Sequence, residues 1–93
     1  MTQNKRYKLR LFVTGASPKS QRALANLRRL CDQHLPDRYD LEVVDVYQQP
    51  TLAAEQQVIA LPMLVKLFPL PVRRLIGDMS NTDKVLVGLG LDI

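Results

Sequence analysis

Apolar and polar side chains alternate along residues 7–14, as in a β-strand with one buried face. Tyr7, Leu9, Leu11 and Val13 would form the buried face, with charged residues on much of the other. The pattern therefore predicts a strand at the start of the chain.

The next apolar residues have the spacing of a helix. Ser17 followed by Pro18 is a typical helix start, because serine caps the free amides and proline fits the first turn. The helix should end near His34, since Leu35 precedes Pro36 and is biased away from helical geometry. Its apolar stripe consists of Ala23, Leu24, Leu27, Leu30 and Cys31.

A second strand is predicted at residues 41–46, which are apolar on both faces apart from Glu42 and Asp45. Burial on both faces is typical of a central strand that pairs in parallel with its neighbour. Strand, helix and strand together form a βαβ unit.

The second half contains shorter apolar segments. Thr51 could cap a short helix over residues 51–59, and residues 63–68 and 72–76 suit two strands. Residues 63–68 also fit one or two buried helical turns, because short apolar runs have no decisive period. With a terminal helix, the predicted order is βαβαββα.

Residues 80–93 fit two secondary structures. Ser80 and Asp83 resemble a capping box, which predicts a helix. Apolar residues at every odd position from 85 onwards predict a strand instead. Gly88 and Gly90 each cost a helix interior about 1 kcal/mol relative to alanine. A change of fold in this segment is therefore a candidate for the function itself.

Length and composition indicate one soluble α/β domain over residues 1–93. No apolar run is long enough to span a membrane and no signal peptide precedes the first strand, so we expect a cytoplasmic protein. The single cysteine excludes an internal disulfide.

The formal net charge of +4 suggests nucleic acid or an acidic protein as a partner. No tryptophan, 5% aromatic residues and no nucleic-acid motif favour the protein partner. We therefore expect no binding to nucleic acid.

The order βαβαββα, with Pro62 just before the third strand, resembles the thioredoxin-like fold. Redox members of that fold carry Cys-x-x-Cys between the first strand and helix, whereas this chain has ASPK at residues 16–19. Cys31 lies on the apolar stripe as a core thiol, and His34 alone cannot form a metal site. No nucleotide fingerprint or hydrolytic triad is present, so we expect no catalytic residue, metal or cofactor.

Four segments together resemble the KaiB family of circadian-clock proteins, and the likeness runs from Tyr7 to about Leu89. They are YKLRLFVTG at residues 7–15, SPKSQRAL at 17–24, VVDV at 43–46 and PLPVRRLIGDMS at 69–80. The last is the most distinctive.

The resemblance implies a metamorphic protein with a flexible N-terminus (residues 1–6), an invariant βαβ half (7–47) and a fold-switching half (48–93). Its ground state would be βαββααβ, as a tetramer or dimer, and its rarer state a thioredoxin-like βαβαββα monomer. The rarer state would bind the N-terminal ATPase ring of KaiC and compete with a sensor histidine kinase that carries a similar domain. KaiA is a further implied partner.

Matching positions imply site residues in two groups. Gly90 stands where the family usually has aspartate, which we expect to favour the strand and hence the ground state of the isolated protein. The sequence also lacks the acidic tail of many relatives. The implied fold-switch residues are Pro62, Pro69, Pro71, Gly88 and Gly90, with slow proline isomerisation as a further step. The implied partner-binding residues are Arg22, Gln48, Pro50, Leu52, Ala53, Glu55, Gln56, Val58, Lys66, Arg73 and Arg74.

Overall fold

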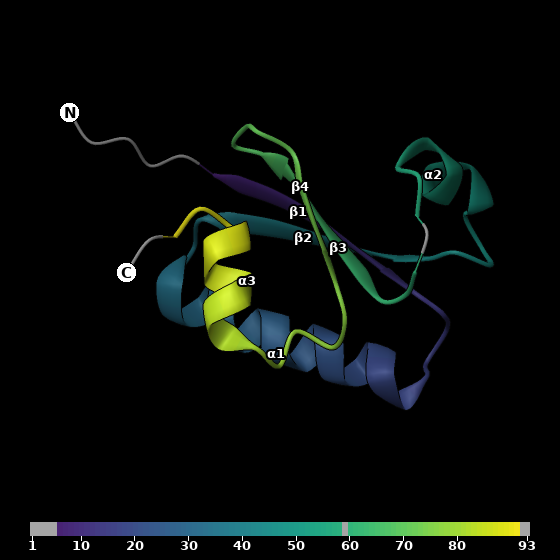
Figure 1. The fold of residues 1–93 in the computed structure, drawn as a ribbon, viewed down its shortest axis with the longest axis horizontal. Helices are drawn as coiled ribbons and strands as arrows, with labels where there is room; N and C mark the ends of the chain where they lie inside the picture. Colours follow the sequence, from purple (N-terminus) through teal and green to yellow (C-terminus); the bar gives the residue numbers. More distant parts are fainter. Residues whose placement is uncertain (1–5, 59, 92–93) are drawn as a thin grey trace.

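A four-stranded mixed sheet with the order β2-β1-β3-β4 forms the centre of the computed structural model, which describes residues 6–58 and 60–91. β1 pairs in parallel with β2 and antiparallel with β3, and β3 pairs antiparallel with β4 (Figure 1). The elements in chain order are β1 (Tyr7–Val13), α1 (Pro18–His34), β2 (Tyr39–Asp45), α2 (Pro50–Glu55), β3 (Met63–Phe68), β4 (Arg73–Ile76) and α3 (Thr82–Gly88).

The order βαβαββα confirms the predicted α/β class and the thioredoxin-like arrangement. The ground-state arrangement predicted for the isolated protein is not the one observed here, and it stays a prediction. The division into residues 7–47 and 48–93 also stays a prediction, and the N-terminal segment 1–6 lies almost wholly outside the described residues.

The predicted central position of the second strand is wrong, because β2 lies at an edge of the sheet. Its parallel pairing with β1 is confirmed, with Leu11 opposite Val43. Val44 is fully buried while Val43 is 38% exposed. β2 pairs with a single strand, β1. Its two faces are nevertheless apolar because helices cover both faces of the sheet.

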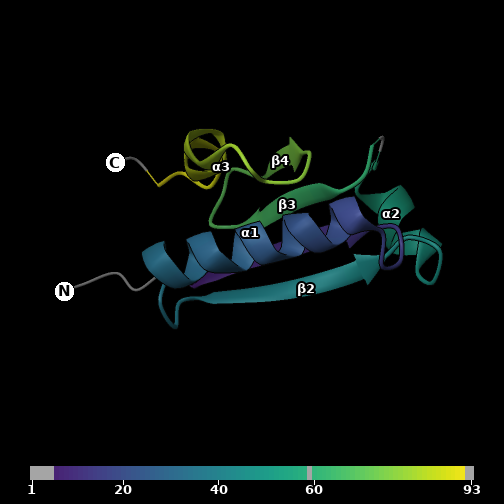
Figure 2. The same ribbon diagram turned by 90° about the horizontal axis from the view of Figure 1, so that it is seen from below.

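α1 confirms the predicted first helix. The Ser17 hydroxyl accepts a hydrogen bond from the Ser20 amide, and Pro18 occupies the first turn. Figure 2 shows α1 running along the sheet. Its apolar stripe packs with α3 on one face of the sheet, where Leu9, Leu11, Leu27, Leu64 and Leu89 are buried together. Within the described residues, no helix is long and apolar enough to cross a membrane.

α2 covers part of the opposite face, at the end of the molecule away from α3 (Figure 1). The predicted bounds of 51–59 are too long, since the helix spans Pro50–Glu55 and follows Gln49. Thr51 lies inside the helix and is not its cap, and residue 59 lies outside the described part. Gln57 ends the segment with φ of 55°, in the left-handed region.

β3 confirms the strand interpretation of residues 63–68 over the helical one. β4 begins at Arg73, one residue later than predicted. The two strands pair in register from Met63 opposite Ile76 to Lys66 opposite Arg73.

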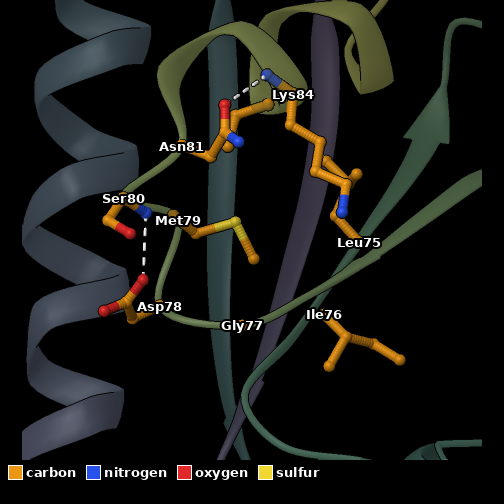
Figure 3. A pocket seen from close by; sticks show the side chains of 9 residues that line it. Leu75, Ile76, Gly77, Asp78, Met79, Ser80, Asn81 and Lys84 are labelled. Carbon is orange, nitrogen blue, oxygen red and sulfur yellow. Dashed lines mark hydrogen bonds between the residues drawn. The ribbon is translucent and has the colours of Figure 1, made fainter.

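α3 confirms the helical reading for residues 82–88, but its cap differs from the prediction. Asn81 is the N-cap, and its side-chain oxygen accepts from the Lys84 amide at 3.1 Å. Ser80 instead donates its own amide to the Asp78 carboxylate at 3.1 Å, as Figure 3 shows. Hydrogen bonds from Ser80 lower the pKa of Asp78. Residues 85–88 of the alternating pattern thus belong to a helix here, residues 89–91 follow its end, and residues 92–93 lie outside the described part.

Candidate functional site

The turn between β1 and α1 holds a cluster of hydroxyl groups where redox thioredoxin-like proteins have cysteines. Ser17 donates to the Ser20 hydroxyl at 2.9 Å, and that hydroxyl accepts from the Thr14 amide at 3.3 Å. These contacts stabilise the start of α1 and provide no thiol for disulfide exchange.

Cys31 is a buried residue of α1, as predicted for a core thiol. Burial, with a smaller contribution from Asp32, raises the pKa of Cys31 to about 12. Its thiolate population at neutral pH is therefore very small, and the thiolate is the reactive form.

We expect Cys31 to resist alkylation in the folded protein. At pH 8, iodoacetamide should modify Cys31 at least about a hundredfold more slowly in the native state than in urea, because both thiolate formation and access require local opening. Mass spectrometry of quenched samples measures both rates. Equal rates would contradict the assignment of Cys31 to the core.

Across residues 6–58 and 60–91, no three His, Cys, Asp or Glu side chains lie close enough together to hold an ion.

Residues 47–58, around α2, form the most protruding candidate surface. Tyr47 is 78% exposed, and Gln48, Pro50 and Glu55 are also exposed. Leu52, Ala53 and Val58 turn inward and pack on the buried cluster of Phe12, Val44, Met63 and Val65. The inward residues hold the segment in place, and the exposed ones are available to a partner.

Arg74 joins this segment from β4. Its Nε donates to the Gln56 carbonyl oxygen at 3.2 Å, at the C-terminal end of α2. The remainder of its guanidinium is exposed beside the helix. We use the term α2 surface for Tyr47, Gln48, Pro50, Glu55 and Arg74.

Lys66 and Arg73 lie on the other face of the sheet. They are opposite each other in the β3–β4 register, and both line a cavity of about 300 Å³ near the end of α3. The Lys66 ammonium donates to the Pro69 carbonyl oxygen at 2.7 Å. Burial, and then the charge of Arg73, lower the pKa of Lys66. The lining of this Lys66 pocket comprises Tyr7, Lys66, Pro69, Leu70, Pro71, Arg73, Val87, Gly88, Leu89 and Gly90.

Arg22 belongs to neither surface. It extends from α1 toward the turn after β4, where its Nε lies 3.7 Å from an Asp78 carboxylate oxygen. The structure therefore places the four predicted basic residues at three locations and brings only Arg74 to the segment 48–58.

The predicted fold-switch prolines occupy two places. Pro62 is buried at the start of β3, and its carbonyl oxygen accepts from the Gly77 amide at 3.0 Å. Pro69 and Pro71 line the Lys66 pocket.

Gly88 is the last residue of α3 and packs tightly against β4. A Cβ atom at this position would lie 2.5 Å from a methyl carbon of Leu75 and 2.9 Å from its Cγ. Real Cβ atoms do not approach carbon this closely, so Leu75 would have to move.

Gly90 ends α3 with a Schellman motif. It has φ of 77°, and its amide donates to the Val87 carbonyl at 3.0 Å. The Leu91 amide donates to the Leu86 carbonyl at 2.9 Å, which completes the motif. The expectation that Gly90 lies in a helix interior is therefore wrong, because it follows the end of α3, where a glycine stabilises the helix end. That Gly90 favours the ground state of the isolated protein stays a prediction.

Sequence reasoning missed Tyr47, Leu75 and Asn81. Asn81 was detectable, since asparagine caps helices as well as serine does. Tyr47 carried a weaker signal, an aromatic residue just after a strand. Nothing local identifies Leu75, because its contact with Gly88 joins segments distant in sequence.

A family model described as "KaiB domain" matches residues 10–91. The chain is 49% identical over 83 residues to the circadian clock protein KaiB3 of a Synechocystis strain, which covers 89% of this chain and 81% of the relative. It is 46% identical over 91 residues to the circadian clock oscillator protein KaiB of Synechococcus elongatus, covering 98% and 89%.

Solved structures share the fold at low sequence identity. The N-terminal domain of Synechococcus elongatus SasA matches with a TM-score of 0.77 and 22% identity, over 99% of this chain and 90% of that chain. Mitochondrial thioredoxin 3 from Saccharomyces cerevisiae matches with a TM-score of 0.74 and 18% identity, over 92% and 78%. These likenesses show a thioredoxin-like fold.

Proposed function

Since the chain belongs to the KaiB family of circadian-clock proteins, we propose that it is a non-enzymatic regulator that binds the N-terminal ATPase ring of KaiC in its thioredoxin-like arrangement. The observation that carries this proposal is the protruding α2 surface, formed in this arrangement and extended by Arg74. The exposed residues offer the Tyr47 ring before α2, the Glu55 carboxylate on α2 and the Arg74 guanidinium on β4, beside inward residues that pack on the core.

Binding through a scarce conformer would supply the delay that timing requires. If the thioredoxin-like arrangement is a minor population in solution, apparent affinity falls by that fraction and capture is slow. We propose that residues 48–93 provide the second arrangement, as a ground-state homo-oligomer, and that the protein acts in the cytoplasm.

Competition with a sensor histidine kinase is part of the proposal. A protein with a similar domain can present a similar surface to KaiC, and the fold likeness to the SasA N-terminal domain supports this. KaiA is a second proposed clock partner.

Glu55→Lys should weaken KaiC binding about tenfold, because it reverses an exposed charge at the centre of the α2 surface. Asp83→Lys makes the same change at an exposed position of α3 and is the matched control. Size exclusion after hours with KaiC and ATP measures complex formation. No co-migration of the unchanged chain in any nucleotide state would refute KaiC as the partner, and equal losses in both variants would refute the α2 surface.

A second candidate function is a thioredoxin-like adaptor that never switches. The Schellman motif at Gly90 favours it, since this motif stabilises α3 in the observed arrangement. NMR would favour the adaptor over the switching regulator if the free chain gave a single set of resonances without exchange and if it bound its partner rapidly.

A further inference from the structure

We propose that the Lys66 pocket binds a carboxylate side chain from an acidic segment of a second partner protein. This surface lies on the opposite face of the sheet from the α2 surface, so its occupation is tested without KaiC.

Among the described residues, the lining of the pocket contains two cations and no acidic side chain. Lys66 is only 4% exposed, and one hydrogen bond, to the Pro69 carbonyl, is found for an ammonium that has three donors. Arg73 faces it directly across the β3–β4 pair, where like charges destabilise a sheet. The ion pairs found in the described part of the chain join Arg6 to Asp40, Arg10 to Glu42 and Arg22 to Asp78, and none includes either cation.

A bound carboxylate would relieve this repulsion. It can accept hydrogen bonds from the ammonium and the guanidinium together, and such charge-assisted bonds are strong. Burial, and to a smaller extent the charge of Arg73, disfavours the charged form of Lys66 and lowers its pKa. Binding of an anion should therefore raise the pKa of Lys66.

The rim of the pocket favours a peptide over nucleic acid. Leu70 and Val87 are each 72% exposed, and Pro69 and Pro71 complete an apolar border. Apolar side chains on both sides of one carboxylate would cover this border. A nucleic acid needs a row of exposed cations and stacking aromatics, whereas the pocket offers one buried ammonium and one exposed guanidinium.

Arg73 and Arg74 give the chain its own matched control. They are adjacent on β4, and their side chains point to opposite faces. Each variant removes one cation from the same strand, so a loss of net charge alone affects both equally.

The test uses an acetylated, amidated pentapeptide with one aspartate between two leucines, titrated into the ¹⁵N-labelled full chain. We expect saturable amide shifts at residues 66–73 and 87–90. Lys66→Met and Arg73→Gln should each weaken binding about tenfold, and Arg74→Gln by less than about twofold.

Several outcomes would overturn the proposal. Shifts that never saturate, equal binding of a peptide with asparagine in place of aspartate, or an equal loss in Arg74→Gln would each do so. Tighter binding of a single-stranded RNA at the same amides would make the pocket a nucleic-acid site instead. Circular dichroism checks that Lys66→Met folds, and exposed Arg73→Gln tests the pocket if it does not.

Discussion

Gly90→Asp is expected to destabilise the thioredoxin-like arrangement by about 1–2 kcal/mol. Residue 90 has a positive φ, and an L-residue in the left-handed region has a free-energy cost of this size, which glycine avoids. The Schellman hydrogen bonds of Gly90 and Leu91 depend on this backbone geometry. The helical form of α3 should therefore become about fivefold to thirtyfold less populated relative to any competing arrangement. Relatives with aspartate at this position would, by the same reasoning, favour the thioredoxin-like state less.

NMR populations of the two arrangements measure this shift, with thermal unfolding as a second readout. Gly90→Asn is the graded control, since asparagine tolerates the left-handed region better than aspartate or alanine. The expected order of helical population is glycine, then asparagine, then aspartate. A larger helical population in Gly90→Asp would show that the strand interpretation of Gly90 was right.

Gly88→Ala is expected to give no net stabilisation of the thioredoxin-like arrangement unless Leu75 is also shortened. Alanine adds up to about 1 kcal/mol of helix propensity. The new methyl group would meet Leu75 at 2.5 Å, and such overpacking typically costs about 1–3 kcal/mol. The collision should therefore cancel or outweigh the gain.

A double-mutant cycle with Leu75→Ala separates the two effects. In that background Gly88→Ala should stabilise the arrangement by about 1 kcal/mol, so the coupling energy should reach at least about 1 kcal/mol. Urea unfolding monitored by circular dichroism measures all four stabilities. Coupling near zero would mean that Leu75 moves aside freely, and helix propensity alone would then decide the effect of Gly88.

The first half of the fold was predictable because each segment there has one clear period. The alternation from Tyr7 and the stripe through Leu27 have a single interpretation each, and both elements formed as predicted. The position of β2 was not predictable, because apolar residues on both faces indicate cover on both faces without saying what provides it.

The second half shows where local signals need tertiary contacts. Gly90 follows Leu89, the last residue of the helical apolar pattern, and a glycine there signals a helix end, but a glycine in a helix interior weakens the helix. Its φ of 77° and the bond from Leu91 to Leu86 decide between them in this arrangement. The alternation of side chains along β4 predicts that Arg73 and Arg74 lie on opposite faces of the sheet. Only the hydrogen bond from Arg74 to the end of α2 shows which surface each residue joins.

The central claim is that KaiC binds the arrangement described here, with α3 helical. Its most direct measurement is the ¹³Cα chemical shifts of Val85, Leu86 and Val87 in a labelled chain bound to the KaiC N-terminal ring. Helical shifts at all three positions, in a complex that forms slowly from a mostly different free state, are the predicted result. Extended shifts at these residues in the complex would contradict the claim.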